Sequence, residues 1–250
     1  GDDSAPACME KVFTIANAQE PDPQPDPEPQ PDPPVQSTSY VAHDYDGDRL
    51  ADVGVRRPAT HLQYIANSSN SDIQRVQFGR DSADIPVSGD FDGDGIEDVA
   101  VRRPSNFHWY IKNSSDSEIQ RIQFGRDVDD IPVPADYDGD GKTDVAVRRA
   151  SNQFWYIRNS SDGESQRIKF GRQATDIPVP ADYDGDGKVD VAVRRPSNFT
   201  WYILRSSDGE IERRVFGRHE DDIPVPADYD GDGKADVAVR RASNQFFYIQ

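Results

Sequence analysis

Five loops of nine residues, each carrying four aspartates, recur along the chain at intervals of 46 residues. The third copy begins at Asp136 and reads Asp-Tyr-Asp-Gly-Asp-Gly-Lys-Thr-Asp, so aspartate occupies positions 1, 3, 5 and 9. Four carboxylates on one turn repel each other without a cation, and hard oxygen ligands in this number suit Ca²⁺. The predicted metal ligands are Asp44, Asp46, Asp48, Asp52, Asp90, Asp92, Asp94, Asp98, Asp136, Asp138, Asp140, Asp144, Asp182, Asp184, Asp186, Asp190, Asp228, Asp230, Asp232 and Asp236.

Two further positions of each loop bear on this prediction. Glycine at position 6 permits the turn, and the main-chain carbonyl at position 7, such as that of Lys142, is expected to complete the coordination. The first loop has Arg49 at position 6, which strains a left-handed backbone and places a positive charge near the ion. We expect one Ca²⁺ per repeat, with the first site the weakest. A metal-free turn rich in aspartate is the alternative.

The charge balance restricts the classes of partner. The chain has 46 acidic and 28 basic residues and a formal net charge of −18. This balance argues against nucleic acid and anionic membranes as partners. Twenty of the acidic residues are the aspartates of the five loops, so bound calcium would offset much of the charge. No apolar run is long enough to span a membrane.

No catalytic arrangement emerges from the spacing of the reactive residues, and we expect a protein that is not an enzyme. The chain contains no phosphate-binding loop and no supported Ser/His/Asp arrangement. Its four histidines fall at unrelated positions of the repeat: His43, His61, His108 and His219.

The same features favour a location outside the cell. Low-affinity calcium sites fill where Ca²⁺ is plentiful, which is the extracellular space. The chain begins with Gly1 rather than methionine, as expected of a mature secreted form. Cys8 is the only cysteine, so an intrachain disulfide is impossible; it is either a free thiol or bonded to another chain.

Three regions follow one another along the chain. Residues 1–20 form a head that contains an apolar run of strand type at 11–16. Residues 21–36 are rich in proline and aspartate, which favours an extended polyproline II linker. Residues 37–250 hold the five repeats.

Each repeat predicts four short strands. In the third repeat these are 131–135, 144–149, 154–158 and 166–171, separated by the aspartate loop and by two turns. Four strands per repeat at this period are typical of propeller blades. We therefore predict an all-β, five-bladed β-propeller of four-stranded repeats; an open β-repeat solenoid is the alternative.

The repeat resembles a known family. The order of the loop at 181–195, the Trp-Tyr-Ile strand at 201–203 and the Phe-Gly-Arg at 216–218 is similar to FG-GAP/VCBS-type repeats, which resemble the integrin α blades. The resemblance implies a β-propeller with calcium between the first two strands of each blade. Members are extracellular and serve adhesion, sugar binding or enzyme scaffolding, so the resemblance leaves the function open.

Two other sets of residues recur with the repeat. Aromatic residues recur at one strand position and are expected to pack between blades: Trp109, Trp155, Trp201 and Phe247. Alternatively, aromatic side chains that face outward could stack on sugars. Arginine pairs such as Arg148 and Arg149 are expected to bind the aspartates that precede each blade, which are Asp84, Asp130, Asp176 and Asp222. Anion binding by these arginines is the alternative.

The fifth repeat lacks a fourth strand, and the head carries an unassigned one. Residues 11–17 fit the missing place when Phe13 and Ile15 are aligned with Val76 and Phe78 of the first repeat. An unpaired edge invites strand addition, either from the chain itself or from a neighbour. The long linker favours the neighbour, and such a head-to-tail contact propagates as a filament.

Two hypotheses about function follow. The first is a secreted, calcium-stabilised structural protein that assembles into an extracellular filament, a homopolymer joined through residues 11–17 of the adjacent subunit. The second is a monomeric, lectin-like propeller that is closed by its own strand and binds glycans between its blades.

Overall fold

The structure is a computed structural model that describes residues 11–13 and 43–250. Strands make up the regular structure, with one short 3₁₀ turn, η1 (Pro58–Thr60). The strands of blade 1 are β2 (Val53–Arg57), β3 (Leu62–Ala66) and β4 (Ile73–Gln77). Those of blade 2 are β5 (Ile85–Gly89), β6 (Asp98–Arg103), β7 (His108–Lys112) and β8 (Ile119–Gln123).

The remaining blades repeat this plan. Blade 3 comprises β9 (Ile131–Pro132), β10 (Val145–Arg149), β11 (Phe154–Arg158) and β12 (Ser165–Lys169). Blade 4 comprises β13 (Ile177–Pro178), β14 (Val191–Arg195), β15 (Thr200–Leu204) and β16 (Ile211–Val215). Blade 5 comprises β17 (Asp222–Pro224), β18 (Ala238–Arg241), β19 (Phe247–Ile249) and β1 (Lys11–Phe13).

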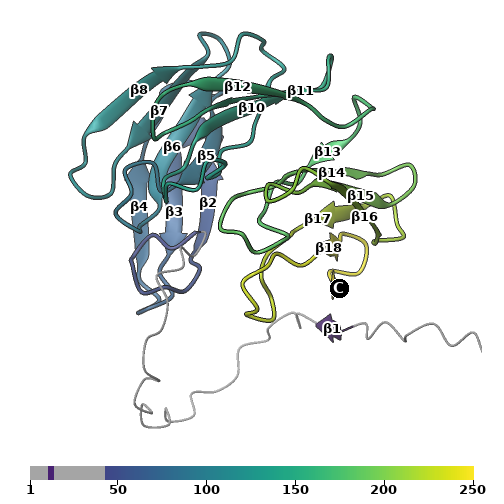
Figure 1. Ribbon diagram of the computed structural model, residues 1–250. Helices are drawn as coiled ribbons and strands as arrows, with labels where there is room; N and C mark the ends of the chain where they lie inside the picture. Colours follow the sequence, from purple (N-terminus) through teal and green to yellow (C-terminus); the bar gives the residue numbers. More distant parts are fainter. Residues whose placement is uncertain (1–10, 14–42) are drawn as a thin grey trace, which may run out of the picture.

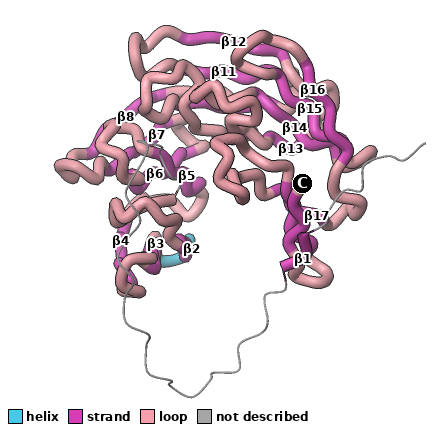
Figure 2. Tube along the Cα trace, turned by 60° about the horizontal axis from the view of Figure 1, so that its bottom comes forward, coloured by secondary structure: helices cyan, strands magenta, loops and turns pink. Residues whose placement is uncertain are grey.

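The five antiparallel sheets form a five-bladed β-propeller, as the repeat pattern predicts. They follow one another around an arc in chain order, from blade 1 to blade 5 (Figures 1 and 2). Strands β9 to β12 match the four strands expected in the third repeat to within a few residues. Within the described residues blade 1 has three strands, and the other blades have four. No helix in this part of the chain has the length and apolarity to cross a bilayer.

Successive blades pack through an apolar layer. In blade 3, Trp155 and Ile157 of β11 form one buried cluster with Val191 and Val193 of β14 in blade 4. Alternation along each strand sends these side chains to one face of the sheet. Trp109, Trp155 and Trp201 have no exposed surface, which confirms the prediction of an inter-blade core for these three residues. Phe247, at the same position of blade 5, is only partly buried. The alternative in which these tryptophans stack on sugars is wrong, because a sugar cannot reach them.

Buried aspartates fasten each blade to the one before it. The carboxylate of Asp130 accepts hydrogen bonds from Nε and Nη2 of Arg149, at 2.7 and 2.8 Å. Its main-chain carbonyl accepts one from Nη1 of Arg102 in the preceding blade, at 2.9 Å. Asp84 and Asp222 repeat both contacts, and Asp176 repeats the one to the carboxylate. The predicted pairing of arginine with these aspartates is confirmed.

Tyrosines lie beneath the same arginines. The guanidinium of Arg149 lies 4.9 Å from the ring centre of Tyr156, whose hydroxyl accepts a hydrogen bond of 3.0 Å from Asn152. The cation–π contact recurs in every blade. These rings are already held by the protein's own cations and amides, so they contribute to packing.

Strand β1 completes blade 5 from the head of the chain. It pairs antiparallel with β19, with Lys11 opposite Ile249 and Phe13 opposite Phe247. In blade 1 the equivalent position of β3 is Gln63, which lies opposite Val76. Phe13 therefore takes the place of Val76, which is the register predicted from the alternation. Ile15 and the linker at 21–36 lie outside the described residues.

Replacing Asp130 by asparagine should destabilise the propeller. The side chain of Asp130 is fully buried against Arg149, so removing its charge leaves a guanidinium partly uncompensated. We expect the free energy of unfolding to fall by about 3 kcal/mol. Urea unfolding with saturating calcium measures the change. Asp129→Asn, at the adjacent exposed position, is the control, and equal stability of the two variants would contradict the role of Asp130.

The same aspartates predict a dependence on pH. Burial alone would raise the pKa of Asp84, Asp130 and Asp176, but hydrogen bonds from arginine and main-chain N–H groups outweigh it, and each pKa is lowered. A lowered pKa stabilises the fold above the unfolded pKa, and that stability is lost as the pH falls through the folded pKa. The stability difference between wild type and Asp130→Asn should therefore be constant above about pH 5 and shrink below about pH 4. A constant difference at all pH values would contradict this assignment.

Candidate metal centres

Each aspartate loop is closed by its first carboxylate. In the third loop, Oδ1 of Asp136 accepts a hydrogen bond from the N–H of Gly139 at 2.6 Å, and Oδ2 accepts one from Gly141 at 2.8 Å. Gly141 has a φ of 85°, in the left-handed region that glycine adopts without strain. The short turn is thus a consequence of the Asp-x-x-Gly-x-Gly spacing.

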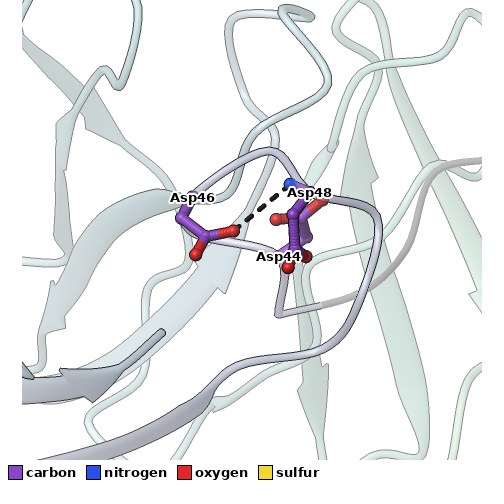
Figure 3. A group of neighbouring side chains, drawn as sticks. All are labelled: Asp44, Asp46 and Asp48. Atoms are coloured by element: carbon purple, nitrogen blue, oxygen red, sulfur yellow. Dashed lines mark hydrogen bonds between the residues drawn. The ribbon is translucent and has the colours of Figure 1, made fainter. Parts of the chain in front are cut away.

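Carboxylates converge in every loop. In each one, three aspartates offer oxygen atoms that lie within 4.8 Å of one another. Ca²⁺ binds oxygen at 2.3–2.6 Å, so oxygens on opposite sides of one ion lie about 5 Å apart. The donor set and its spacing therefore fit a calcium ion. The groups are Asp44, Asp46 and Asp48 (Figure 3); Asp90, Asp92 and Asp94; Asp136, Asp138 and Asp144; Asp182, Asp184 and Asp190; and Asp228, Asp230 and Asp236.

The remaining predicted ligands belong to the same loops but fall outside these groups of three. They are Asp52, Asp98, Asp140, Asp186 and Asp232. Asp140 accepts a hydrogen bond from the N–H of Lys142 at 2.8 Å, which keeps its carboxylate at the loop. The structure thus brings three of the four predicted aspartates of each repeat together at one point.

In every loop except the first, the aspartate at position 9 is the most buried of the four. Oδ2 of Asp144 accepts a hydrogen bond from the N–H of Tyr137 at 2.9 Å, and Oδ1 accepts one from the main-chain N–H of Ser160 at 2.7 Å. Burial raises the pKa of Asp144 to about 6, and that of Asp98 to about 6 as well. A divalent cation bound in each loop would favour the ionised form of the aspartate at position 9.

Pairs of serines cover four of the loops, and the sequence analysis missed this role. Ser160 donates a hydrogen bond to Asp140 at 2.9 Å, and Ser161 donates one to Asp138 at 2.6 Å. From the sequence alone, this segment is expected only to form a turn between two strands. A signal was present, because the pair recurs with the 46-residue period: Ser68 and Ser69, Ser114 and Ser115, Ser160 and Ser161, and Ser206 and Ser207. Side chains from the turn between the third and fourth strands thus hold the acidic loop in place.

Neighbouring loops are bonded to each other. The N–H of Thr143, at position 8, donates to the carbonyl of Asp90 in the preceding loop at 2.7 Å. The same bond links the other consecutive loops, through Glu97, Val189 and Ala235. Lys142, at position 7, lies over Gly93 of the preceding loop and donates from Nζ to the carbonyl of Asp92 at 2.8 Å. Order at one metal centre is therefore coupled to the next.

The first loop departs from the others as predicted. Arg49 adopts a φ of 70°, which a residue with a Cβ tolerates poorly. Nevertheless, its N–H makes the same hydrogen bond to Oδ2 of Asp44 as the glycine at this position makes elsewhere, at 2.8 Å. The loop keeps its shape at the cost of backbone strain, so the first centre stays the one we expect to be weakest.

Replacing Arg49 by glycine should strengthen the first centre. The change removes strain of about 1 kcal/mol and a nearby positive charge, so we expect calcium affinity at this site to rise several-fold. Isothermal titration calorimetry measures the affinity. Gly141→Arg is the reciprocal variant, since no atom lies within 4 Å of a side chain added there, and it should weaken the third centre. Unchanged affinity in both variants would contradict this interpretation.

Comparisons with known proteins agree with this architecture. Among solved structures, the chain is similar to an Agrocybe aegerita lectin that recognises non-reducing terminal N-acetylglucosamine, with a TM-score of 0.51, 16% identity and 72% of this chain covered. It is also similar to the Photorhabdus luminescens Tc holotoxin pore, with a TM-score of 0.51, 14% identity and 87% of this chain covered. The match spans about half of the lectin chain (55%) and 11% of the toxin chain. At these identities the likeness concerns the fold alone.

No curated protein matches the chain. A family model described as an FG-GAP-like repeat matches residues 90–147, 136–193 and 182–239. These matches together cover more than half of the chain, and each runs from one aspartate loop through the next one. The chain therefore belongs to the family of FG-GAP-like repeat proteins.

Proposed function

We propose that this chain is a calcium-stabilised structural protein of the extracellular space that assembles head to tail through its N-terminal strand. The observation that carries the proposal is the place of β1 as the outermost strand of blade 5, hydrogen-bonded to β19. The strand comes from the opposite end of the chain. The blade is thus completed by an element that a neighbouring subunit could supply equally well.

Calcium supports the stability of this assembly unit. Each blade holds a group of three carboxylates whose oxygens lie close enough to share one ion. Ions in these loops would remove the repulsion between the carboxylates and tie the first two strands of each blade together. Since sites of this type fill at high calcium concentrations, the proposal places the protein outside the cell.

Strand exchange would allow the pairing of β1 with β19 to form either within one chain or between two subunits. In the structure, β1 pairs with β19 of the same chain. Residues 14–42 separate β1 from the first described loop, whereas the turn between blades 1 and 2 spans only residues 81–84. Exchange of an identical element between subunits keeps the same register and the same hydrogen bonds. A long connection of this kind favours exchange, and the contact propagates because donor and acceptor differ.

Glycan binding is the alternative function. Its support is the fold shared with the Agrocybe aegerita lectin. The tryptophans expected to carry it are buried, and the adjacent tyrosines are engaged by arginine. This alternative requires separate particles, each closed by its own β1, and it therefore gives a different result in the experiment below.

Electron microscopy in millimolar Ca²⁺ tests the proposal. We expect filaments that dissociate when a chelator is added, because the blades lose their ions. Deleting residues 1–20 should leave folded monomers, since the strand at 11–13 is removed. Deleting residues 1–10 keeps that strand and should leave the filaments intact. Filaments that persist without residues 1–20 would contradict strand donation, and uniform single particles of the wild type would favour the alternative.

A further inference from the structure

Blade 1 exposes apolar side chains that the other blades bury. Val53 and Val55 of β2 are 67% and 57% exposed, whereas the equivalent Val145 and Val147 of β10 are 4% and 0% exposed. Leu50, at position 7 of the first loop, is 60% exposed. We refer to Leu50, Ala51, Val53 and Val55 as the blade 1 face.

Blade 5 exposes the complementary side of the repeat. Tyr229, at position 2 of the fifth loop, is 42% exposed, whereas the equivalent Tyr137 and Tyr183 are buried. A side chain added at Gly231 would meet no atom within 4 Å, but the equivalent Gly185 lies beneath Lys234 of the next loop. We refer to Asp228, Tyr229 and Gly231 as the blade 5 face.

Contacts inside the molecule show what covers such faces. First, the tyrosine or phenylalanine at position 2 and the tryptophan of one blade cluster with the two valines of the next blade. Second, the side chain at position 7 lies over the glycine at position 4 of the preceding loop. Third, the N–H at position 8 donates to the carbonyl at position 1 of that loop, at 2.6–2.8 Å. These contacts recur with the blades, so they define one interface.

The two terminal faces hold the two halves of this interface. The blade 1 face offers the valine pair, Leu50 at position 7 and the N–H of Ala51 at position 8. The blade 5 face offers Tyr229, the glycine at position 4 and the carbonyl of Asp228 at position 1. Within the described residues no hydrogen bond joins Ala51 to Asp228. Apart from the tryptophan, which Phe247 replaces in blade 5, every group needed for a further interface of the same kind is present, but at opposite ends of the arc (Figure 2).

We infer that the blade 5 face of one copy of this chain docks on the blade 1 face of a second copy. Leu50 then covers Gly231 of the other copy, the N–H of Ala51 donates to Asp228, and the valines pack under Tyr229. A second copy is favoured over closure by the same chain. The chain's own β1 already completes blade 5, yet the blade 1 and blade 5 faces of that chain stay exposed.

This inference deepens the proposed assembly and rests on it for its direction. The head that donates β1 precedes blade 1 in the sequence, so a copy docked through its blade 1 face brings its own β1 to the blade 5 it covers. Both contacts then join the same two subunits in the same order. The faces differ from one another, so the contact is heterologous and does not saturate at a dimer.

Sedimentation velocity in millimolar Ca²⁺ tests the docking. The double variant Val53→Asp, Val55→Asp should weaken association of the full chain about 100-fold, because two apolar contacts are lost and charges are buried. Val215→Asp is the control, since Val215 is 70% exposed on the outer strand of blade 4. Equal association of the double variant and the control overturns the inference, as does a wild type that stays monomeric at every concentration. Leu50→Asp gives the same test if the double variant fails to fold.

Mixing variants tests the direction of the contact. Tyr229→Arg damages the blade 5 face and leaves the blade 1 face intact, whereas the double valine variant does the reverse. Each variant alone should associate weakly, and their mixture should form a heterodimer through the two intact faces. A mixture that remains as weakly associated as its components overturns the pairing of these two faces.

The deletion of residues 1–20 separates this inference from the proposed function. If the deletion prevents assembly while the double valine variant assembles normally, strand donation stands and face docking fails. If the valine variant loses assembly while the deletion keeps it, face docking stands and strand donation fails. Loss of assembly in both variants, with the Val215→Asp control unaffected, supports both contacts.

Discussion

The packing of one blade on the next is the interaction on which this structure depends. A blade of short strands has two faces, and neither its tryptophan nor its valine pair can be buried within the blade itself. In blade 3, Trp155 is fully buried in a cluster that includes Val191 and Val193 of blade 4. Stability is therefore a property of neighbouring pairs of blades, as in other repeat proteins.

Polar contacts give this apolar packing its orientation. Asp130 joins its own blade through Arg149 and the preceding blade through Arg102, so a single buried residue determines where two sheets meet. At the aspartate loops, the hydrogen bond from the N–H of Thr143 to the carbonyl of Asp90 joins blade 3 to blade 2 a second time. Because directional bonds act on both sides of each apolar layer, the blades can stack only in one register.

The acidic loops contain repulsion between carboxylates, which the apolar core does not offset. Carboxylates held within a few ångströms of each other oppose folding unless a cation lies between them. The serines that donate to Asp138 and Asp140 reduce this repulsion only in part, since a hydroxyl carries no net charge. A cation bound in these loops would therefore make the stability of the fold depend on the ionic conditions, in line with the proposed calcium-stabilised assembly.

The sequence alone predicts the repeat, the strands, the aspartate loops and the register of Phe13, because each follows from local spacing and alternation. It also indicated that Arg49 would adopt a left-handed backbone, since glycine occupies that position in the other loops. Only the folded arrangement of the blades shows that the serine pairs contact the loops and that the tryptophans are inaccessible to sugars. It alone separated the buried Val147 from the exposed Val55, although the two occupy the same place in the repeat. The physical reason is that burial depends on what lies across the interface, and a residue's own sequence neighbours do not specify that.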